Sequence, residues 1–349
     1  MHYDNQTWIL RRRPVGQLRS SDLELVNGTI EHVPAGECLI KTRYLAMDPA
    51  TRGWMGESGG YMDPLPLDGP VFGVTVGEVI VSKDPQVTPG TVVMGLGAWG
   101  RYSVGPIVPG TLGELGVFSP TQASDEQQIH QCLHALGTSG ATAWYGLLDV
   151  ARMQPGDKVF VSAAGGSVGS LVVQIAKLRG AAKVVGCASS AHRCEQIVAQ
   201  YGADACIDYR HSPDLRGALA REFPDGIDVY FDNVGGEVLE AVLDTLAPGA
   251  RIAACGMISQ YNDAKGQGAP IRNLWNLLVR EATMTGFLVS SYFGTDACGR
   301  AFAQLAKWLQ EGQLRAIVDE RDLFHDITRA YNLLFSGEKF GRLIVRVPD

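Results

Sequence analysis

The sequence predicts an α/β protein in which a β-rich part precedes a doubly wound parallel sheet. In residues 1 to about 120, short apolar or β-branched runs alternate with Gly/Pro turns, a pattern typical of β-strands. From about 125 to 290, short apolar runs alternate with helical stretches, a pattern typical of βαβ units. The chain has 349 residues, of which 46% are hydrophobic, so it can fill two cores.

The β-rich part shows its strands most clearly in two runs, residues 37–41 and 77–81. Residues 105–120 carry enough glycine and proline to form a connecting loop. We therefore expect the first domain to span residues 1–124.

The second part contains six apolar runs that have the length of strands buried on both faces of a parallel sheet. They are Lys158–Ala163, Lys183–Cys187, Ala205–Asp208, Ile227–Asp232, Arg251–Cys255 and Thr283–Leu288. Farther on, residues 295–311 have the periodicity of an amphipathic helix, and residues 342–347 form a strand-like run. We expect residues 125–294 to form the second domain and residues 295–349 to complete the first.

Charge and cysteine usage limit the classes of partner and compartment. A formal net charge of −7 disfavours nucleic acid and anionic lipid as partners. No apolar run is long enough to span a bilayer, and the N-terminal residues do not form a secretion signal, so no membrane partner is expected. The cysteines form no C-x-x-C pair and no evident disulfide framework; they are Cys38, Cys132, Cys187, Cys194, Cys206, Cys255 and Cys298. We expect a cytoplasmic protein with reduced thiols.

A glycine-rich turn follows the first strand of the second part. Residues 159–169 read Val-Phe-Val-Ser-Ala-Ala-Gly-Gly-Ser-Val-Gly, and helical periodicity follows. In the G-x-G-x-x-G register, alanine replaces the first glycine at Ala164, whereas Gly166 and Gly169 remain. Gly166 would let the backbone approach a pyrophosphate, Gly169 would allow close helix–strand packing, and the helix N-terminus would hold the anion. The later βα units favour a dinucleotide site over a purely structural turn.

The end of the next strand distinguishes NADPH from NADH. An NAD site places a carboxylate there to hold the ribose 2′-OH, whereas residues 187–193 contain none. A guanidinium can pair with a 2′-phosphate, so Arg193 favours NADPH. The alternative is a solvated arginine whose charge Glu195 neutralises.

Polar side chains beyond two later strands are further candidates, because open α/β sheets bind ligands at the carboxyl ends of their strands. Tyr261 could donate a hydrogen bond to an oxygen that becomes negative during a reaction. Alternatively, it only packs against a cofactor. Asn233 could contact a cofactor, serve as a helix N-cap, or do both.

His130 and His134 are spaced to share one face of a helix, as zinc ligands can. No third ligand is evident, so incidental histidines on an amphipathic helix are favoured and no metal is expected. The chain also lacks the G-x-S-x-G and Walker motifs, which disfavours hydrolases and nucleoside triphosphatases.

Five segments carry a resemblance to a known family: residues 44–49, 52–55, 162–169, 232–236 and 255–262. Over nearly its whole length the chain resembles the medium-chain dehydrogenase/reductase family. Within it, the chain is similar to the zinc-independent leukotriene dehydrogenase/prostaglandin reductase group, which includes 2-alkenal and curcumin reductases. The resemblance implies a GroES-like β-rich catalytic domain, a Rossmann domain that binds NADPH, and a homodimer.

The resemblance also implies site residues. It places Arg193 at the 2′-phosphate, Tyr209 on the adenosine side, and Tyr261 beside the nicotinamide and substrate. The full set of implied cofactor contacts is Ala163, Gly166, Ser167, Val168, Gly169, Arg193, Tyr209, Asn233, Cys255, Gly256, Ser259, Tyr261, Phe287 and Val289.

Two positions depart from the family pattern. Ala50 stands where many members carry a substrate-side tyrosine, which Tyr44 or Tyr61 could replace. Lys339 stands where the family often has an asparagine that contacts the cofactor.

The implied reaction is the reduction of the C=C bond of an α,β-unsaturated ketone or aldehyde. Hydride from NADPH reaches the β-carbon, and Tyr261 is the candidate catalytic residue that stabilises the enolate oxygen. Alcohol oxidation is the weaker hypothesis because no zinc is expected to polarise an alcohol oxygen. Two alternatives stay open: an NADPH quinone reductase and an NADPH-binding protein without turnover.

Overall fold

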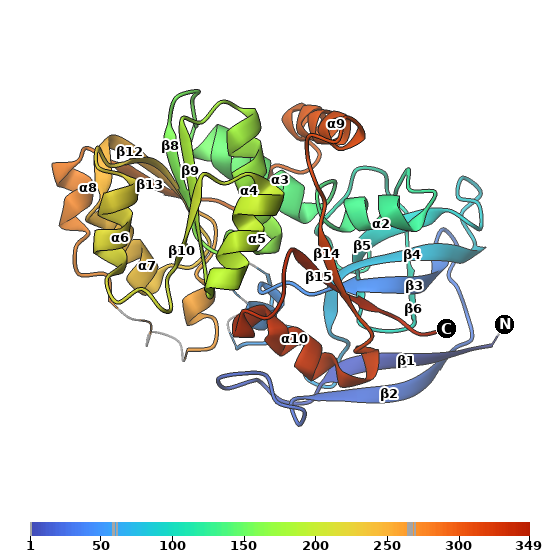
Figure 1. Cartoon of the computed structure of the whole chain (residues 1–349). Helices are drawn as coiled ribbons and strands as arrows, with labels where there is room; N and C mark the ends of the chain where they lie inside the picture. The colour runs from blue at the N-terminus through green and yellow to red at the C-terminus, as the bar shows by residue number, and fades with distance from the viewer. Residues whose placement is uncertain (1, 58–59, 61, 264–267, 269) are drawn as a thin grey trace. The chain divides into compact units, whose positions relative to one another are not determined.

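The computed structural model describes residues 2–57, 60, 62–263, 268 and 270–349. The chain forms two compact units (Figure 1). Unit 1 comprises Met1–Leu133, Val318–Glu338 and Arg342–Asp349, and unit 2 comprises His134–Ile317 and Lys339–Gly341. Among the helices of the described residues, none combines the length and the apolar character needed to cross a membrane.

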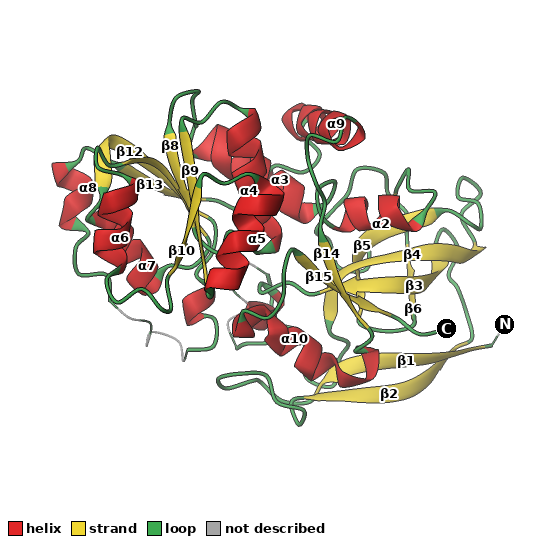
Figure 2. Cartoon of the chain, in the orientation of Figure 1, coloured by secondary structure: helices red, strands yellow, loops and turns green. Residues whose placement is uncertain are grey.

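Unit 1 is built on a seven-stranded sheet (Figure 2). The strand order is β14-β15-β3-β4-β5-β7, and β6 pairs with β3. These strands are β3 (Cys38–Ala46), β4 (Phe72–Ser82), β5 (Val92–Ala98), β6 (Tyr102–Gly105), β7 (Phe118–Pro120), β14 (Val318–Arg321) and β15 (Arg342–Arg346). A separate antiparallel pair and three α-helices complete the unit: β1 (Tyr3–Leu10), β2 (Leu23–Ile30), α1 (Thr51–Trp54), α2 (Glu126–Leu133) and α10 (Ile327–Ser336).

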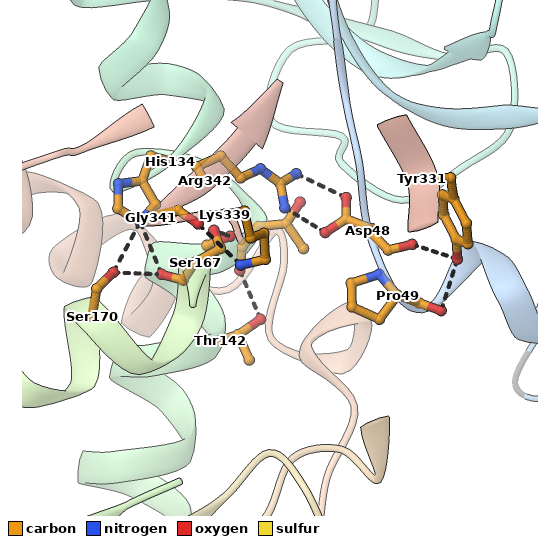
Figure 3. Close-up of polar contacts among 12 residues, drawn as sticks. Asp48, Pro49, His134, Thr142, Ser167, Ser170, Tyr331, Lys339, Gly341 and Arg342 are labelled. Carbon is orange, nitrogen blue, oxygen red and sulfur yellow. Dashed lines mark hydrogen bonds and ion pairs between the residues drawn. The ribbon is translucent and has the colours of Figure 1, made fainter. Parts of the chain in front are cut away.

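A buried ion pair ties the segment after β3 to the last strand. Arg342 of β15 is only 1% exposed, and its guanidinium makes two contacts with the Asp48 carboxylate, with Nη2 2.8 Å from Oδ2 (Figure 3). The Tyr331 hydroxyl of α10 donates to the carbonyl oxygens of Asp48 and Pro49 at 3.0 and 3.2 Å. Removing Asp48 would cost about 3–5 kcal/mol, because the Arg342 charge would stay buried without its partner. The Asp48-Pro49 turn is therefore firmly held.

Unit 2 is a six-stranded, all-parallel sheet with the order β10-β9-β8-β11-β12-β13. Numbered along the unit, this is 3-2-1-4-5-6, the order of the dinucleotide-binding doubly wound fold. The strands are β8 (Lys158–Val161), β9 (Lys183–Ala188), β10 (Ala205–Asp208), β11 (Ile227–Asp232), β12 (Leu246–Ala254) and β13 (Thr283–Gly286). The strand order reverses between β8 and β11, so ligands are expected beyond the carboxyl ends of these two strands.

Helices cover both faces of this sheet (Figure 2). Val159 and Val161 of β8 pack in one core with α4, α5 and α9, whereas Phe160 packs in a second core with α6 and α7. This alternation is the period of a strand buried on both faces. The helices are α3 (Thr138–Trp144), α4 (Ser167–Leu178), α5 (Ala191–Tyr201), α6 (Leu215–Glu222), α7 (Gly236–Leu243), α8 (Trp275–Val279) and α9 (Asp296–Gln310), and a π-helix spans Tyr145–Val150.

The predicted fold class, a β-rich domain with a doubly wound parallel sheet, is confirmed, and all six predicted strands are present. The bounds of β10 and β11 are as predicted, and those of the other four differ by a few residues, most for β12, which begins at Leu246. One detail was wrong: β13 was expected to be buried on both faces, but Thr283, Thr285 and Gly286 are exposed. The reason is that β13 is the edge strand of the six-stranded sheet.

Candidate cofactor and catalytic site

The glycine-rich turn after β8 makes a tight passage into α4. Ala163 adopts a positive φ of 48°, which turns the chain sharply. A Cβ on Gly169 would lie 2.3 Å from the Ala163 carbonyl oxygen and 2.9 Å from Ala164 Cα. Only glycine therefore fits at position 169, because helix and turn touch there through backbone atoms.

The N-terminus of α4 presents backbone amides that precede the first turn of the helix. Gly166 is the N-cap residue and makes no side-chain cap hydrogen bond. The first bond of the helix runs from the Ser170 amide to the Gly166 carbonyl at 3.0 Å. The amides of Ser167, Val168 and Gly169 therefore precede the first hydrogen bond within the helix, and amides in this position can bind an anion.

A buried histidine anchors this helix start. His134 is fully buried, and its Nε2 lies 2.8 Å from the Ser167 carbonyl oxygen (Figure 3). Because a carbonyl oxygen only accepts, Nε2 carries the hydrogen. The Ser170 hydroxyl donates to the same carbonyl at 3.1 Å, and the Ser139 and Ser167 hydroxyls lie 2.7 Å apart. α2 ends at Leu133, before His134, so the expected pair of histidines on one helical face does not form.

A short segment from near the end of the chain completes this side of the site. The Gly341 amide donates to the Gly165 carbonyl at 2.8 Å, which brings residues 339–341 against the glycine-rich turn. The Lys339 ammonium donates to the Gly341 carbonyl at 3.2 Å and lies 3.6 Å from where a Cβ on Gly166 would be. Lys339 therefore puts a positive charge beside the amides at the start of α4.

Arg193 lies in the first turn of α5, just beyond β9. Ser190 caps this helix by accepting from the Arg193 amide at 3.3 Å. The Arg193 guanidinium lies 5.5 Å from the Phe340 ring centroid and donates to Gln196 Oε1 at 2.6 Å. Phe340 in turn stacks on Tyr201 with a centroid separation of 5.1 Å. These contacts orient the guanidinium.

The residues around Arg193 include Glu195, the carboxylate that could neutralise the Arg193 charge, and Tyr209. The alternative partner, Glu195, is highly exposed and lies 4.0 Å from His192. Tyr209 follows β10, is half-buried, and donates its amide to the Ala188 carbonyl at 3.0 Å. Arg193 and Tyr209 thus flank the carboxyl end of β9.

The carboxyl ends of β8 and β11 are joined by Asn233 and Ser162. Asn233 donates its side-chain amide to the Ser162 carbonyl at 2.8 Å, and its backbone amide to the Ser162 hydroxyl at 2.9 Å. The preceding Asp232 accepts from the Tyr230 hydroxyl at 2.7 Å and from two backbone amides at 2.9 Å. Burial raises the pKa of Asp232 above its usual value, and these donors oppose that shift. Asn233 is thus fixed at the point where the strand order reverses.

The loop after β12 packs against the loop after β11. Ser259 donates its hydroxyl to the Val234 carbonyl at 2.5 Å, and the amides of Cys255 and Gly256 both donate to the Asp232 carbonyl, at 2.8 and 3.0 Å. Burial raises the pKa of Cys255 to about 12, so this thiol stays protonated. The structure therefore brings Asn233, Cys255, Gly256 and Ser259 together at one edge of the sheet.

Tyr261 folds back over the same loop. Its hydroxyl oxygen accepts from the Met257 amide at 3.2 Å and lies 3.0 Å from where a Cβ on Gly256 would be. A phenol that accepts one hydrogen bond can still donate its own hydrogen. Burial raises the pKa of Tyr261 above 10, so it keeps that hydrogen at neutral pH.

Phe287 and Val289 follow β13. The Phe287 ring meets Tyr145 edge-on at a centroid distance of 5.5 Å, and Phe231 at 6.2 Å. Val289 begins a short 3₁₀ turn and packs beside the buried Tyr292. Both residues are half-buried.

Tyr44 belongs to unit 1. Tyr44 is buried, its hydroxyl contacts the Glu126 carboxylate, and the Arg346 guanidinium lies 5.4 Å from its ring centroid. Burial and the contact with Glu126 raise the pKa of Tyr44. A hydroxyl already held by a carboxylate is a poor donor to a substrate, and the expected substrate contact of Tyr44 stays a prediction. Tyr61 lies outside the described residues.

Among the described residues, one group of three could hold a metal ion: Glu126, His130 and Glu320. Arg346 pairs with both carboxylates, at 3.0 and 2.5 Å, and His130 Nε2 lies 3.4 Å from Glu320. These contacts compensate the charge of the two carboxylates within unit 1.

Comparison with known proteins follows the same division of the chain. Residues 6–108 match a family model described as the N-terminal domain of oxidoreductase, and residues 167–311 match one described as zinc-binding dehydrogenase. The chain is 34% identical to 2-alkenal reductase (NADP(+)-dependent) of Nicotiana tabacum, covering 98% of this chain and 97% of that protein. It is 32% identical to NADPH-dependent curcumin reductase of Escherichia coli (strain K12), again over 98% and 97%.

Structural similarity is equally extensive. The crystal structure of CurA in complex with NADPH from Vibrio vulnificus superposes with a TM-score of 0.90 at 31% identity, over 99% of both chains. The chain belongs to the zinc-independent reductases of the medium-chain dehydrogenase/reductase family. The predicted family is confirmed.

In this reductase, sequence reasoning missed three residues that shape the site: His134, Ser162 and Phe340. Ser162 lies in the strand-to-turn sequence that was singled out, so its position at a strand end was the available signal. His134 was considered only as a metal ligand, and Phe340 lies 147 positions along the chain from Arg193, whose guanidinium it faces. No local pattern indicates such a distant contact.

Proposed function

We propose that this reductase uses NADPH to reduce the C=C bond of α,β-unsaturated aldehydes and ketones. The observation that carries the proposal is the set of cationic and backbone donors at the carboxyl ends of β8 and β9. Three amides of α4 and the Lys339 ammonium suit a diphosphate, and the oriented Arg193 guanidinium suits a 2′-phosphate. The named activities of the tobacco and E. coli relatives support the same reaction.

These residues fit the cofactor. Glycine at 166 keeps the space above the turn open, because a Cβ there would lie 3.1 Å from the Ala163 carbonyl oxygen and 3.6 Å from Lys339 Nζ. We propose that Ala163, Gly166, Ser167, Val168 and Gly169 hold the diphosphate and that Tyr209 packs on the adenosine side. Asn233, Cys255, Gly256, Ser259, Phe287 and Val289 would line the nicotinamide end. Bound NADPH supplies the hydride.

Tyr261 is the proposed catalytic residue. When a hydride adds to the β-carbon of an enone, negative charge moves to the carbonyl oxygen. A protonated phenol can donate a hydrogen bond to that oxygen, and the loop that holds Tyr261 fixes its position before the reaction. A water molecule can then protonate the α-carbon, so the chain does not require a dedicated general acid.

The deciding experiment measures oxidation of NADPH and NADH with a 2-alkenal, an enone and a quinone, and identifies the product. The expected result is a saturated carbonyl compound formed with NADPH in preference to NADH. Turnover of the quinone alone would establish a quinone reductase instead. Tight binding of NADPH without turnover of any acceptor would identify an NADPH-binding protein.

We also propose a homodimer formed through the edge of unit 2. On and beside α8, Leu274, Trp275, Leu278 and Val279 are 49–68% exposed, and the neighbouring β13 leaves its outer edge unpaired within the described sheet. Exposed apolar clusters and open strand edges favour association, and two copies of one edge can pair about a two-fold axis. Sedimentation should give a dimer for the native chain and a monomer for Trp275→Glu. A monomeric native chain at micromolar concentration would refute the dimer.

Finally, we propose the cytoplasm as the location of the protein. All seven cysteines have free thiols, as a reducing compartment favours. Fractionation of the source cells, followed by detection of the protein in each fraction, tests the assignment.

A further inference from the structure

Two cysteines of unit 2 face each other beside the proposed 2′-phosphate site. Cys194 lies in the first turns of α5, directly after Arg193, and Cys206 lies in β10 (Figure 1). Cys206 pairs in register with Gly186, and its Sγ lies 3.8 Å from where a Cβ on Gly186 would be. The Ile197 side chain of α5 meets the same point at 3.4 Å, so Cys206 points to the sheet face that α5 covers.

Cys194 lies on the face of α5 that is turned toward β10. It lies three residues before Ile197 and is buried with it, which puts both on the inner face of α5. The Cys194 thiol is within hydrogen-bonding reach of the Cys206 thiol and of the Ala188 backbone. These contacts lower the pKa of Cys194 below its usual value, while Cys206 keeps its proton. A thiolate near a helix N-terminus is the reactive form of cysteine.

We propose that Cys194 and Cys206 form a redox-active pair that hydroperoxides convert to a disulfide, and that this disulfide weakens NADPH binding. The second part rests on the proposed function. In the first step the Cys194 thiolate attacks the terminal oxygen of the hydroperoxide and the O–O bond breaks. Cys194 becomes a sulfenic acid, and the alkoxide or hydroxide that leaves takes up the proton that Cys194 released.

In the second step the Cys206 sulfur attacks the Cys194 sulfur. An S–S bond forms, the S–O bond breaks, and the hydroxide leaves as water with the Cys206 proton. The pair loses two electrons and the hydroperoxide gains them. Reduction by a dithiol restores both cysteines.

The link to the cofactor follows from the neighbours of the pair. An S–S bond is about 2.05 Å long, far shorter than a hydrogen bond between thiols, so we expect its formation to draw the first turn of α5 toward β10. That turn carries Arg193, and the Ala188 backbone that contacts Cys194 also accepts from the Tyr209 amide at 3.0 Å. The shift therefore displaces residues proposed to hold the adenosine end of NADPH.

Peptide mapping tests the first part of the proposal. Trypsin cuts after Arg193 and Arg210, so both cysteines fall in one peptide, 194–210, whereas Cys187 falls in the peptide before it. Hydrogen peroxide should convert peptide 194–210 of the native chain to a form that has lost two hydrogens, and dithiothreitol should restore it. Two peptides joined through Cys187, or Cys194 oxidised to a sulfinic acid without a disulfide, would overturn the pair.

Variants and cofactor titration complete the test. Cys206→Ser should leave a sulfenic acid on Cys194 that dimedone traps, and Cys194→Ser should leave Cys206 unmodified. Cys187→Ala is the matched control, because Cys187 lies in the neighbouring strand β9 but packs in the core on the other sheet face. This variant should form the disulfide as the native chain does. A modified Cys206 in Cys194→Ser would contradict the proposed order of steps.

Affinity for NADP+ should fall at least about tenfold on oxidation, the loss expected when one hydrogen bond to a charged group is broken. Unchanged affinity of the oxidised protein would refute the coupling to the cofactor. If the reduced protein itself does not bind NADP+, the proposed function fails, while peptide mapping still decides whether the pair forms.

Discussion

Replacing Arg193 with glutamine tests whether this side chain reads the 2′-phosphate. The Arg193 guanidinium is held between the Phe340 ring and Gln196, so little ordering is needed when it binds an anion. A hydrogen bond to a charged group contributes about 1.5–3 kcal/mol, and 1.4 kcal/mol is tenfold in affinity. We therefore expect Arg193→Gln to raise the Kd of NADPH by about 10- to 150-fold, and that of NADH hardly at all.

The assay is calorimetric titration of both nucleotides at one stated salt concentration. Arg179→Gln is the matched control, because the Arg179 guanidinium also lies over an aromatic ring, 5.9 Å from the Trp144 centroid, but at the opposite end of α4. This variant should bind both nucleotides as the native chain does. An equal loss of NADPH and NADH affinity in Arg193→Gln, or no loss, would refute the role of Arg193 as the 2′-phosphate contact.

Three further predictions concern the same site. Tyr261→Phe removes the proposed donor, so kcat should fall about 100- to 1,000-fold while NADPH affinity is retained. Because burial raises the pKa of Tyr261, the native enzyme should lose this donor only at a higher pH than an exposed tyrosine would. An unchanged kcat in the variant would exclude Tyr261 as the donor. Lys339→Met removes a charge beside the amides proposed to hold the diphosphate, a group that both nucleotides share. The affinities for NADPH and NADH should therefore fall together, by about tenfold, in the same titration. A loss of affinity for NADPH alone would contradict this placement. Gly169→Ala places a Cβ 2.3 Å from the Ala163 carbonyl oxygen and should lower the free energy of unfolding, measured by urea denaturation, by about 1–3 kcal/mol. The control Gly299→Ala in α9, with open space around it, should be neutral or slightly stabilising. Equal effects of the two substitutions would refute the close approach at Gly169.

Local sequence patterns were sufficient to predict most of the strands and helices of unit 2. The strand bounds of β10 and β11 and the caps of α9, Thr295 and Glu311, coincide with the predicted ranges, because buried parallel strands and amphipathic helices have strong periodicities. The glycine spacing likewise pointed to the turn, since the backbone contact at Gly169 admits no other residue.

Other features depend on packing that no local pattern encodes. Composition places a boundary near residue 124 and another near residue 294. In the structure, Ile129 and Leu133 of α2 pack in the core of unit 1, and Leu305 and Trp308 of α9 pack in a core of unit 2. The exposure of β13 was missed, because an edge strand with apolar residues has the same sequence pattern as a central strand.

The contact between residues 339–341 and the glycine-rich turn has a consequence for how the protein is made. Gly341 and Gly165 are separated by most of unit 2 along the chain, yet their backbones are hydrogen-bonded. Contacts of such high sequence separation form late in folding, and on the ribosome Lys339 and Phe340 emerge after all the strands of the parallel sheet. A nascent chain can therefore build the sheet and the α4 amides before it gains the ammonium and the aromatic ring of the proposed nucleotide site. Newly made protein becomes competent to bind nucleotide tightly only once translation has passed this segment.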